Sequence, residues 1–97
     1  MYGTVARFTA KPNSEGALRE LTRAEDPSDS DGYAFHYIYR LDSGNDQYIL
    51  VAGFKDKDSY VANANSPEQN EFYQKFRALL ISDPEWADGE IIDSGTA

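Results

Sequence analysis

Two polar residues in one predicted strand could take part in chemistry. His36 is the only histidine of the chain, and Arg40 follows it four residues later. An imidazole can act as a general base when a second group orients it, and the sequence identifies no such group. An arginine guanidinium can hold an anionic or phenolate oxygen. The simpler interpretations are a half-buried packing residue for His36 and an ion pair at the sheet edge for Arg40.

A second group combines large rings with side-chain amides. Rings around a few amides are typical of a pocket for a flat apolar ligand. A filled core explains the phenylalanines equally well. Asn63 is harder to explain in that way, because asparagine is a mediocre helix former and stands just before a helix start. The group consists of Tyr60, Asn63, Asn65, Phe72, Tyr73 and Phe76.

Other motifs that carry chemistry are absent from the sequence. There is no nucleophile elbow, no phosphate-binding loop and no histidine pair at metal-ligand spacing. The chain has no cysteine, which excludes disulfides, thiolate metal sites and a cysteine nucleophile. Residues 25–32 contain four acids and two serines, but not the ligand order of a calcium loop. We therefore predict no metal site.

Charge and hydropathy exclude two classes of partner. Asp and Glu total 17 against 9 Lys and Arg, a formal charge of −8, which disfavours nucleic acid and anionic membrane surfaces. No apolar run approaches the ~20 residues that span a bilayer, and no basic and apolar signal stretch follows Met1. We expect one cytoplasmic domain over residues 1–97, with 40% hydrophobic residues to supply its core.

The elements that must position these residues follow from periodicity and turn signals. Strands are expected over residues 2–10, 33–41, 48–54 and 90–93. Ser14 or Asn13 caps a first short helix, and Asp56 or Asp58 caps a second one near Tyr60. Ser66, Pro67 and Gln69 form a capping box for a further helix, which Asp83-Pro84 ends. The apolar stripe of that helix is Phe72, Phe76, Leu79 and Leu80.

Side chains alternate clearly in the second strand. One face carries Tyr33, Phe35, Tyr37, Tyr39 and Leu41, and the other carries Ala34, His36, Ile38 and Arg40. The third strand is apolar on both faces. The element order predicts an α+β fold of the ferredoxin-like βαββαβ type, with four antiparallel strands and the helices on one face. The apolar opposite face would then be covered most simply in a twofold homodimer.

Three segments resemble the antibiotic biosynthesis monooxygenase-like family. Residues 54–67 (FKDKDSYVANANSP) resemble the passage from its third strand to its second helix. Residues 5–12 (VARFTAKP) resemble its first strand, and residues 31–40 its second. The resemblance covers nearly the whole chain and implies a dimeric α+β barrel. Many members have tryptophan in place of Phe54 and histidine in place of Asn63, and haem-degrading relatives have an asparagine near Ala6.

These departures imply the cofactor-free type of monooxygenase, because haem binding through that histidine is not available here. The first hypothesis is a cofactor-independent monooxygenase-like protein acting on a small aromatic or quinol-like compound. Its pocket would lie between the second helical segment and the sheet, with His36, Arg40 and Asn63 as catalytic candidates, lined by Phe54, Tyr60, Asn63, Phe72 and Phe76. The alternative is a non-catalytic dimeric small-molecule-binding or stress-response module. Polar groups that converge on the pocket would favour the enzyme.

Overall fold

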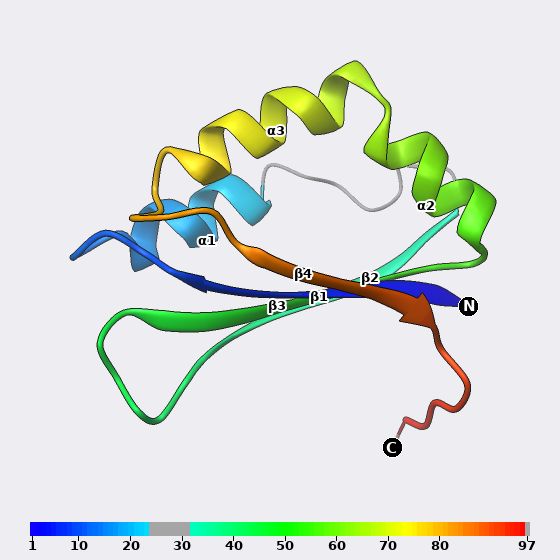
Figure 1. Ribbon diagram of the computed structural model, residues 1–97, viewed down its shortest axis with the longest axis horizontal. Helices are drawn as coiled ribbons and strands as arrows, with labels where there is room; N and C mark the ends of the chain where they lie inside the picture. Colours follow the sequence, from blue (N-terminus) through cyan, green and yellow to red (C-terminus); the bar gives the residue numbers. More distant parts are fainter. Residues whose placement is uncertain (24–31, 97) are drawn as a thin grey trace.

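The computed structural model describes residues 1–23 and 32–96, and their elements follow the predicted order (Figure 1). Of the acidic segment 25–32, only Gly32 is among the described residues. In the part of the chain that is described, no cluster of His, Asp or Glu could hold a metal ion, and no helix is long and apolar enough to cross a membrane. The elements are β1 (Tyr2–Thr9), α1 (Glu15–Arg23), β2 (Tyr33–Arg40), β3 (Gln47–Phe54), α2 (Lys57–Ala64), α3 (Pro67–Arg77) and β4 (Glu85–Glu90).

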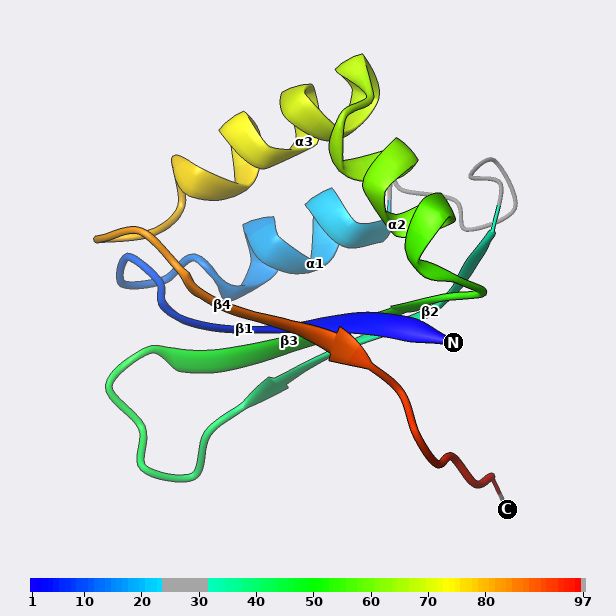
Figure 2. The same cartoon turned by 45° about the vertical axis from the view of Figure 1, so that its right-hand side comes forward.

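The four strands form one antiparallel sheet in the order β2-β3-β1-β4. The three helices lie on the same side of this sheet (Figures 1 and 2). The chain leaves β4 toward the opposite side of the sheet. This arrangement confirms the predicted ferredoxin-like α+β fold with its helices on one face.

Aromatic and aliphatic side chains of β1, β3, α1 and α3 form the core between sheet and helices. The ring of Phe8 stacks on Tyr48 at 5.5 Å and meets the edge of Phe76 at 4.9 Å between centroids. Leu18 of α1 and Leu80, just beyond α3, close the cluster. Each of these side chains is at most 5% exposed, so this end of the helix layer is well packed.

Serine and aspartate side chains fix the starts of the two later helices. Asp56 accepts from the Ser59 amide at 2.8 Å and begins α2, while Ser66 accepts from the Gln69 amide at 3.1 Å and begins α3. Pro67 occupies the first turn of α3. The capping of α3 by Ser66 is confirmed, but the Gln69 side chain accepts from the Asn63 amide instead of returning to the cap.

The last strand and the end of α3 differ from the prediction. β4 is Glu85–Glu90, not 90–93, because it pairs with β1 from Arg7 opposite Glu85 to Tyr2 opposite Glu90. Asp and Gly are poor strand formers, so this pairing overrides local preference. α3 ends at Arg77, before Asp83-Pro84, because Leu80 pairs with Ala10. Leu79 and Leu80 therefore pack from outside the helix.

The face of the sheet on which the Tyr33 side chain lies was also predicted wrongly. Tyr33 pairs with Phe54, but Phe35 pairs with Gly53, so the register shifts by one residue within β2. Such a bulge adds a residue to one strand and turns the side chain before it to the other face. Tyr33 therefore lies on the helix-facing side with His36, and not with Phe35 and Tyr37.

Candidate functional site

A cavity of about 480 Å³ lies between the sheet and the helices. Its wall includes all five residues predicted to line a pocket, Phe54, Tyr60, Asn63, Phe72 and Phe76, and also His36. Its volume is in the range of small-molecule sites. The other described lining residues are Thr4, Thr22, Tyr33, Leu50, Ala52, Ala64, Gln69, Asn70, Tyr73, Trp86 and Asp88.

The strand register places four lining residues in one row across the sheet. His36 of β2 is opposite Ala52 of β3, Ala52 is opposite Thr4 of β1, and Thr4 is opposite Asp88 of β4. Neighbouring strands are about 4.8 Å apart, so the α-carbons of His36 and Asp88 are separated by roughly 14 Å. The small side chain of Ala52 leaves room between them. This row forms a floor with an imidazole at one edge and a carboxylate at the other.

At the β2 edge, His36 is paired with Tyr33. The Tyr33 hydroxyl and His36 Nδ1 are hydrogen-bonded, and the two rings meet edge to face at 6.0 Å. Tyr33 also meets Phe54 edge to face at 5.3 Å. The bulge in β2 thus supplies the partner of His36 that the sequence did not identify.

At the β4 edge, two hydroxyl groups converge on one carboxylate oxygen. Thr4 Oγ1 donates to Asp88 Oδ1 at 2.6 Å, and the Tyr60 hydroxyl donates to the same oxygen at 3.0 Å. Burial, and next the hydrogen bond to Asp88, raise the pKa of the Tyr60 phenol. Tyr60 is therefore a neutral donor at physiological pH, and the second oxygen of Asp88 is left as an acceptor for a ligand donor.

Asn63 belongs to α2 and brings amide groups to the wall. Its side-chain nitrogen donates to Gln69 Oε1 at 3.4 Å. Its main-chain carbonyl accepts from the Ser66 hydroxyl at 2.7 Å and from the Ser66 amide at 3.0 Å. The backbone of Asn63 thus carries the structural contacts, and the side chain makes only a long hydrogen bond.

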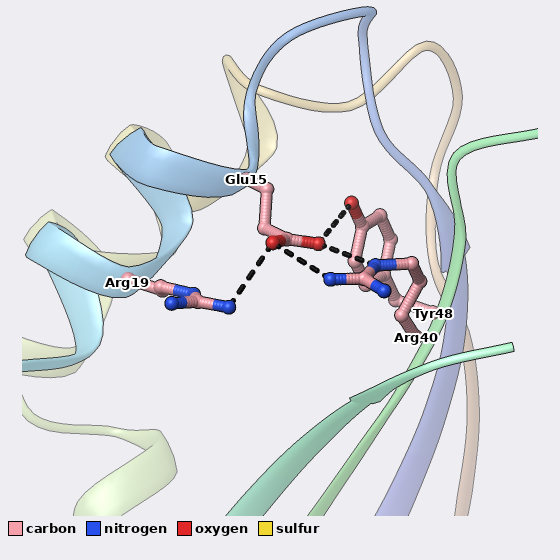
Figure 3. A network of polar contacts seen from close by, with 4 residues as sticks. All are labelled: Glu15, Arg19, Arg40 and Tyr48. Atoms are coloured by element: carbon pink, nitrogen blue, oxygen red, sulfur yellow. Dashed lines mark hydrogen bonds and ion pairs between the residues drawn. The ribbon is translucent and has the colours of Figure 1, made fainter.

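Arg40 lies outside this cavity, in a polar network with Glu15 (Figure 3). Arg40 Nε donates to Glu15 Oε1 at 2.7 Å, and its Nη2 donates to Oε2 at 3.0 Å. Arg19 and Tyr48 donate to the same carboxylate. The hydrogen bonds from Arg40 are the main reason why the pKa of Glu15 is lowered to about 2. The ion pair that the sequence suggested for Arg40 is present.

Several lining residues were not singled out from the sequence. Thr4 and Ala52 look like ordinary strand residues, and only the register shows that they lie in the floor. Asp88 and Trp86 were missed because β4 was placed too late in the chain. Gln69 was noted only as part of the capping box that begins at Ser66. Its side chain also pairs with Asn63 in the cavity wall.

The residues of the cavity do not fit haem. Its described wall contains no lysine or arginine that could pair with the two carboxylates of haem. The set of rings, hydroxyls and amides instead suits a flat ligand with oxygen substituents.

Comparisons with known proteins find the same fold. No protein-family model matches the chain, and no curated protein matches it in sequence. Many solved structures match it, and many of them bear the name antibiotic biosynthesis monooxygenase. A structure from Deinococcus radiodurans, provisionally given that name, has a TM-score of 0.79 and 13% identity and covers 100% of this chain and 98% of its own.

Two further matches extend over similar lengths. A variant of SnoaB, a cofactor-independent oxygenase from Streptomyces nogalater, has a TM-score of 0.78 and 18% identity and covers 96% of this chain and 94% of its own. A conserved protein from Methanosarcina mazei has a TM-score of 0.78 and 17% identity, with 91% and 89% covered. At these identities the likeness shows the fold, which is monooxygenase-like over nearly the whole chain.

Proposed function

We propose that this protein is a cofactor-independent monooxygenase-like protein that acts on a small aromatic or quinol-like compound. The observation that carries the proposal is the meeting of polar groups on a ring-lined cavity. His36 with Tyr33, Tyr60 with Asp88, and Asn63 with Gln69 all line the same space. The name of SnoaB, whose fold is similar, agrees with this class of reaction.

The chemistry that such a site would support needs no bound cofactor. A phenol that has lost its proton is electron-rich at the ring carbon opposite the oxygen, and this carbon can reduce dioxygen. A carbon–oxygen bond forms, and loss of water from the resulting peroxide leaves a quinone carbonyl. One oxygen atom of O₂ ends in the product and the other in water, and the substrate supplies all four electrons that reduce O₂.

The residues of the cavity would assist in two ways. Donors placed at a developing oxyanion stabilise it most in a site from which water is excluded. His36 and Asn63 carry the donor groups, and Phe54 and Phe72 supply apolar walls. Arg40 has no part in this account, because Glu15 holds its guanidinium in a neighbouring site.

A non-catalytic binding module is the second candidate, and one observation favours it. The polar groups of the cavity are paired with one another, as in the pairs Tyr60–Asp88 and Asn63–Gln69. A protein that only sequesters or senses an aromatic compound would need no free catalytic group.

Oxygen uptake separates the two candidates. Purified protein would be mixed with anthrone, 1-naphthol and 2,6-dimethylphenol, in each of which the carbon opposite the oxygen carries hydrogen, and each reaction would be corrected for spontaneous oxidation. Protein-dependent uptake with formation of the quinone supports the monooxygenase. A rise in melting temperature with the same compounds but no uptake supports the binding module. Absence of both effects with all three compounds would contradict the proposed function.

A further inference from the structure

The bulge in β2 gives His36 a partner that bonds only one of its two ring nitrogens. Tyr33 is hydrogen-bonded to Nδ1, and both rings line the cavity. In the part of the chain that the structure describes, Nε2 has no hydrogen-bond partner. Nε2 is therefore the nitrogen left for a ligand.

The chemistry of the two groups decides the direction of the bond. A neutral imidazole has one N–H donor and one bare nitrogen, and the partner of one nitrogen sets the role of the other. A phenol hydroxyl is a better donor than acceptor, and a bare imidazole nitrogen is a stronger acceptor than a phenol oxygen. Donation from Tyr33 to Nδ1 places the imidazole proton on Nε2. The edge-to-face contact of Tyr33 with Phe54 also fixes the phenol in place.

We propose that Tyr33 is a positioning residue that holds neutral His36 as an Nε2–H donor toward an anionic oxygen of the ligand. The ligand part of this inference rests on the proposed function. His36 then stabilises a phenolate and does not itself remove the phenolic proton. Since the described wall contains no lysine or arginine, the Nε2–H group is the donor best suited to select ligands with an ionisable hydroxyl.

The single histidine makes the tautomer directly measurable. Protein labelled with nitrogen-15 at histidine gives one pair of ring signals, which would be followed over a pH series until the shifts of the neutral ring no longer change. We expect Nδ1 in the range of a bare nitrogen and Nε2 in the range of a protonated one. In Tyr33→Phe the two signals should move toward each other, as the tautomers mix. Tyr37→Phe, on the other face of the same strand, is the matched control and should leave both signals unchanged.

A second measurement tests the effect on a ligand. The ionised form of 4-nitrophenol absorbs visible light, so its absorbance at fixed pH reports the bound phenolate. Wild type and Tyr37→Phe should increase the phenolate fraction, and Tyr33→Phe should weaken phenolate binding about three- to tenfold, since one charge-assisted hydrogen bond loses its fixed geometry. The non-ionisable 4-nitroanisole should bind both variants equally.

The outcomes separate the two claims. A bare Nε2 in the wild type would overturn the positioning role. The same would follow if Tyr33→Phe had the ring-nitrogen signals and the phenolate affinity of the wild type. The expected tautomer without binding of either nitro compound would support the role of Tyr33 and contradict the proposed function.

Discussion

At the scale of single residues, the same ring can serve both core and cavity. Phe76 lines the cavity, yet it is only 1% exposed and packs against Phe8 and Phe72. Phe72 lies in the same helix and is half-buried. The sequence left both interpretations open for these phenylalanines, and burial now assigns Phe76 mainly to the core.

We therefore expect Phe76→Ala to lower the free energy of unfolding by about 3–5 kcal/mol, since it loses transfer energy and leaves a void. Phe72→Ala is the matched comparison and should cost clearly less, because its ring already faces open space. Urea denaturation of both variants measures the difference. Equal losses for the two variants would show that Phe76 is not the core ring that its burial indicates.

Glu15 provides a prediction of pH dependence. Its pKa is lowered from 4.5 to about 2 in the folded protein, chiefly by Arg40. A carboxylate with a lowered folded pKa stabilises fully above its unfolded pKa, and this contribution disappears as the pH falls toward the folded value. Glu15→Gln should therefore be less stable than wild type at neutral pH, and the gap should close between about pH 4.5 and 2.

The measurement is the urea midpoint of both proteins over this pH range. Glu20→Gln, on the exposed side of the same helix, is the control and should show a smaller gap. Because the Glu15 pair is partly exposed, salt should reduce its effect. A gap between Glu15→Gln and wild type that stays constant from neutral pH to pH 3 would contradict the lowered pKa of Glu15.

At the scale of elements, local signals predicted what lies next to them in sequence. The Ser66 cap, the start of α2 near Asp56 and the period-two pattern of β2 from Phe35 to Arg40 were readable because a few neighbouring residues determine them. The position of β4 and the bulge in β2 were not, because each depends on pairing with a distant strand. The candidate site divides in the same way, since Tyr60 and Asn63 lie in a recognisable helical segment, whereas Tyr33 and Asp88 join the cavity only through the sheet register.

The Ser66 cap makes a prediction about α3. Ser66→Ala should destabilise the protein by about 1 kcal/mol, because the Gln69 amide loses its acceptor. Ser66→Asp, which can still accept that bond, should restore most of the stability. Thermal unfolding of both variants tests this, with Ser94→Ala in the exposed tail as the control. An unchanged melting temperature in Ser66→Ala would show that the hydroxyl does not cap the helix in solution.

At the scale of the whole molecule, the face of the sheet opposite the helices carries exposed apolar side chains. Val5, Tyr37 and Tyr39 lie there and are 41%, 63% and 49% exposed. Phe35 covers Gly53 on the same face. Apolar surface of this kind is typical of an interface, and a twofold contact with a second copy is the simplest way to cover it.

We predict a homodimer of about twice the chain mass of 10.9 kDa in sedimentation equilibrium at micromolar concentration. Tyr37→Glu should shift it toward the monomer, because a charge would be buried in the interface. Ile81→Glu, at an exposed position between α3 and β4, is the control for added negative charge. A wild-type protein that sediments with the mass of one chain would contradict this prediction, and the cavity would then belong to a monomer.

The central claim is that the cavity beside Asn63 takes a flat aromatic ligand, and Trp86 offers the most direct test of it. Trp86 is the only tryptophan and lines the cavity. Its fluorescence would be titrated with 2-naphthol and, separately, with haem, in wild type and in Asn63→Ala. Asn63→Ala should keep its melting temperature within a few degrees, because the contacts to Ser66 come from the main chain.

For 2-naphthol we predict saturable quenching with one site per chain in the wild type and weaker binding in Asn63→Ala. Haem should give no stoichiometric complex and no shift of its Soret band. Quenching that never saturates and is identical in both proteins, or a tight one-to-one complex with haem, would contradict the account.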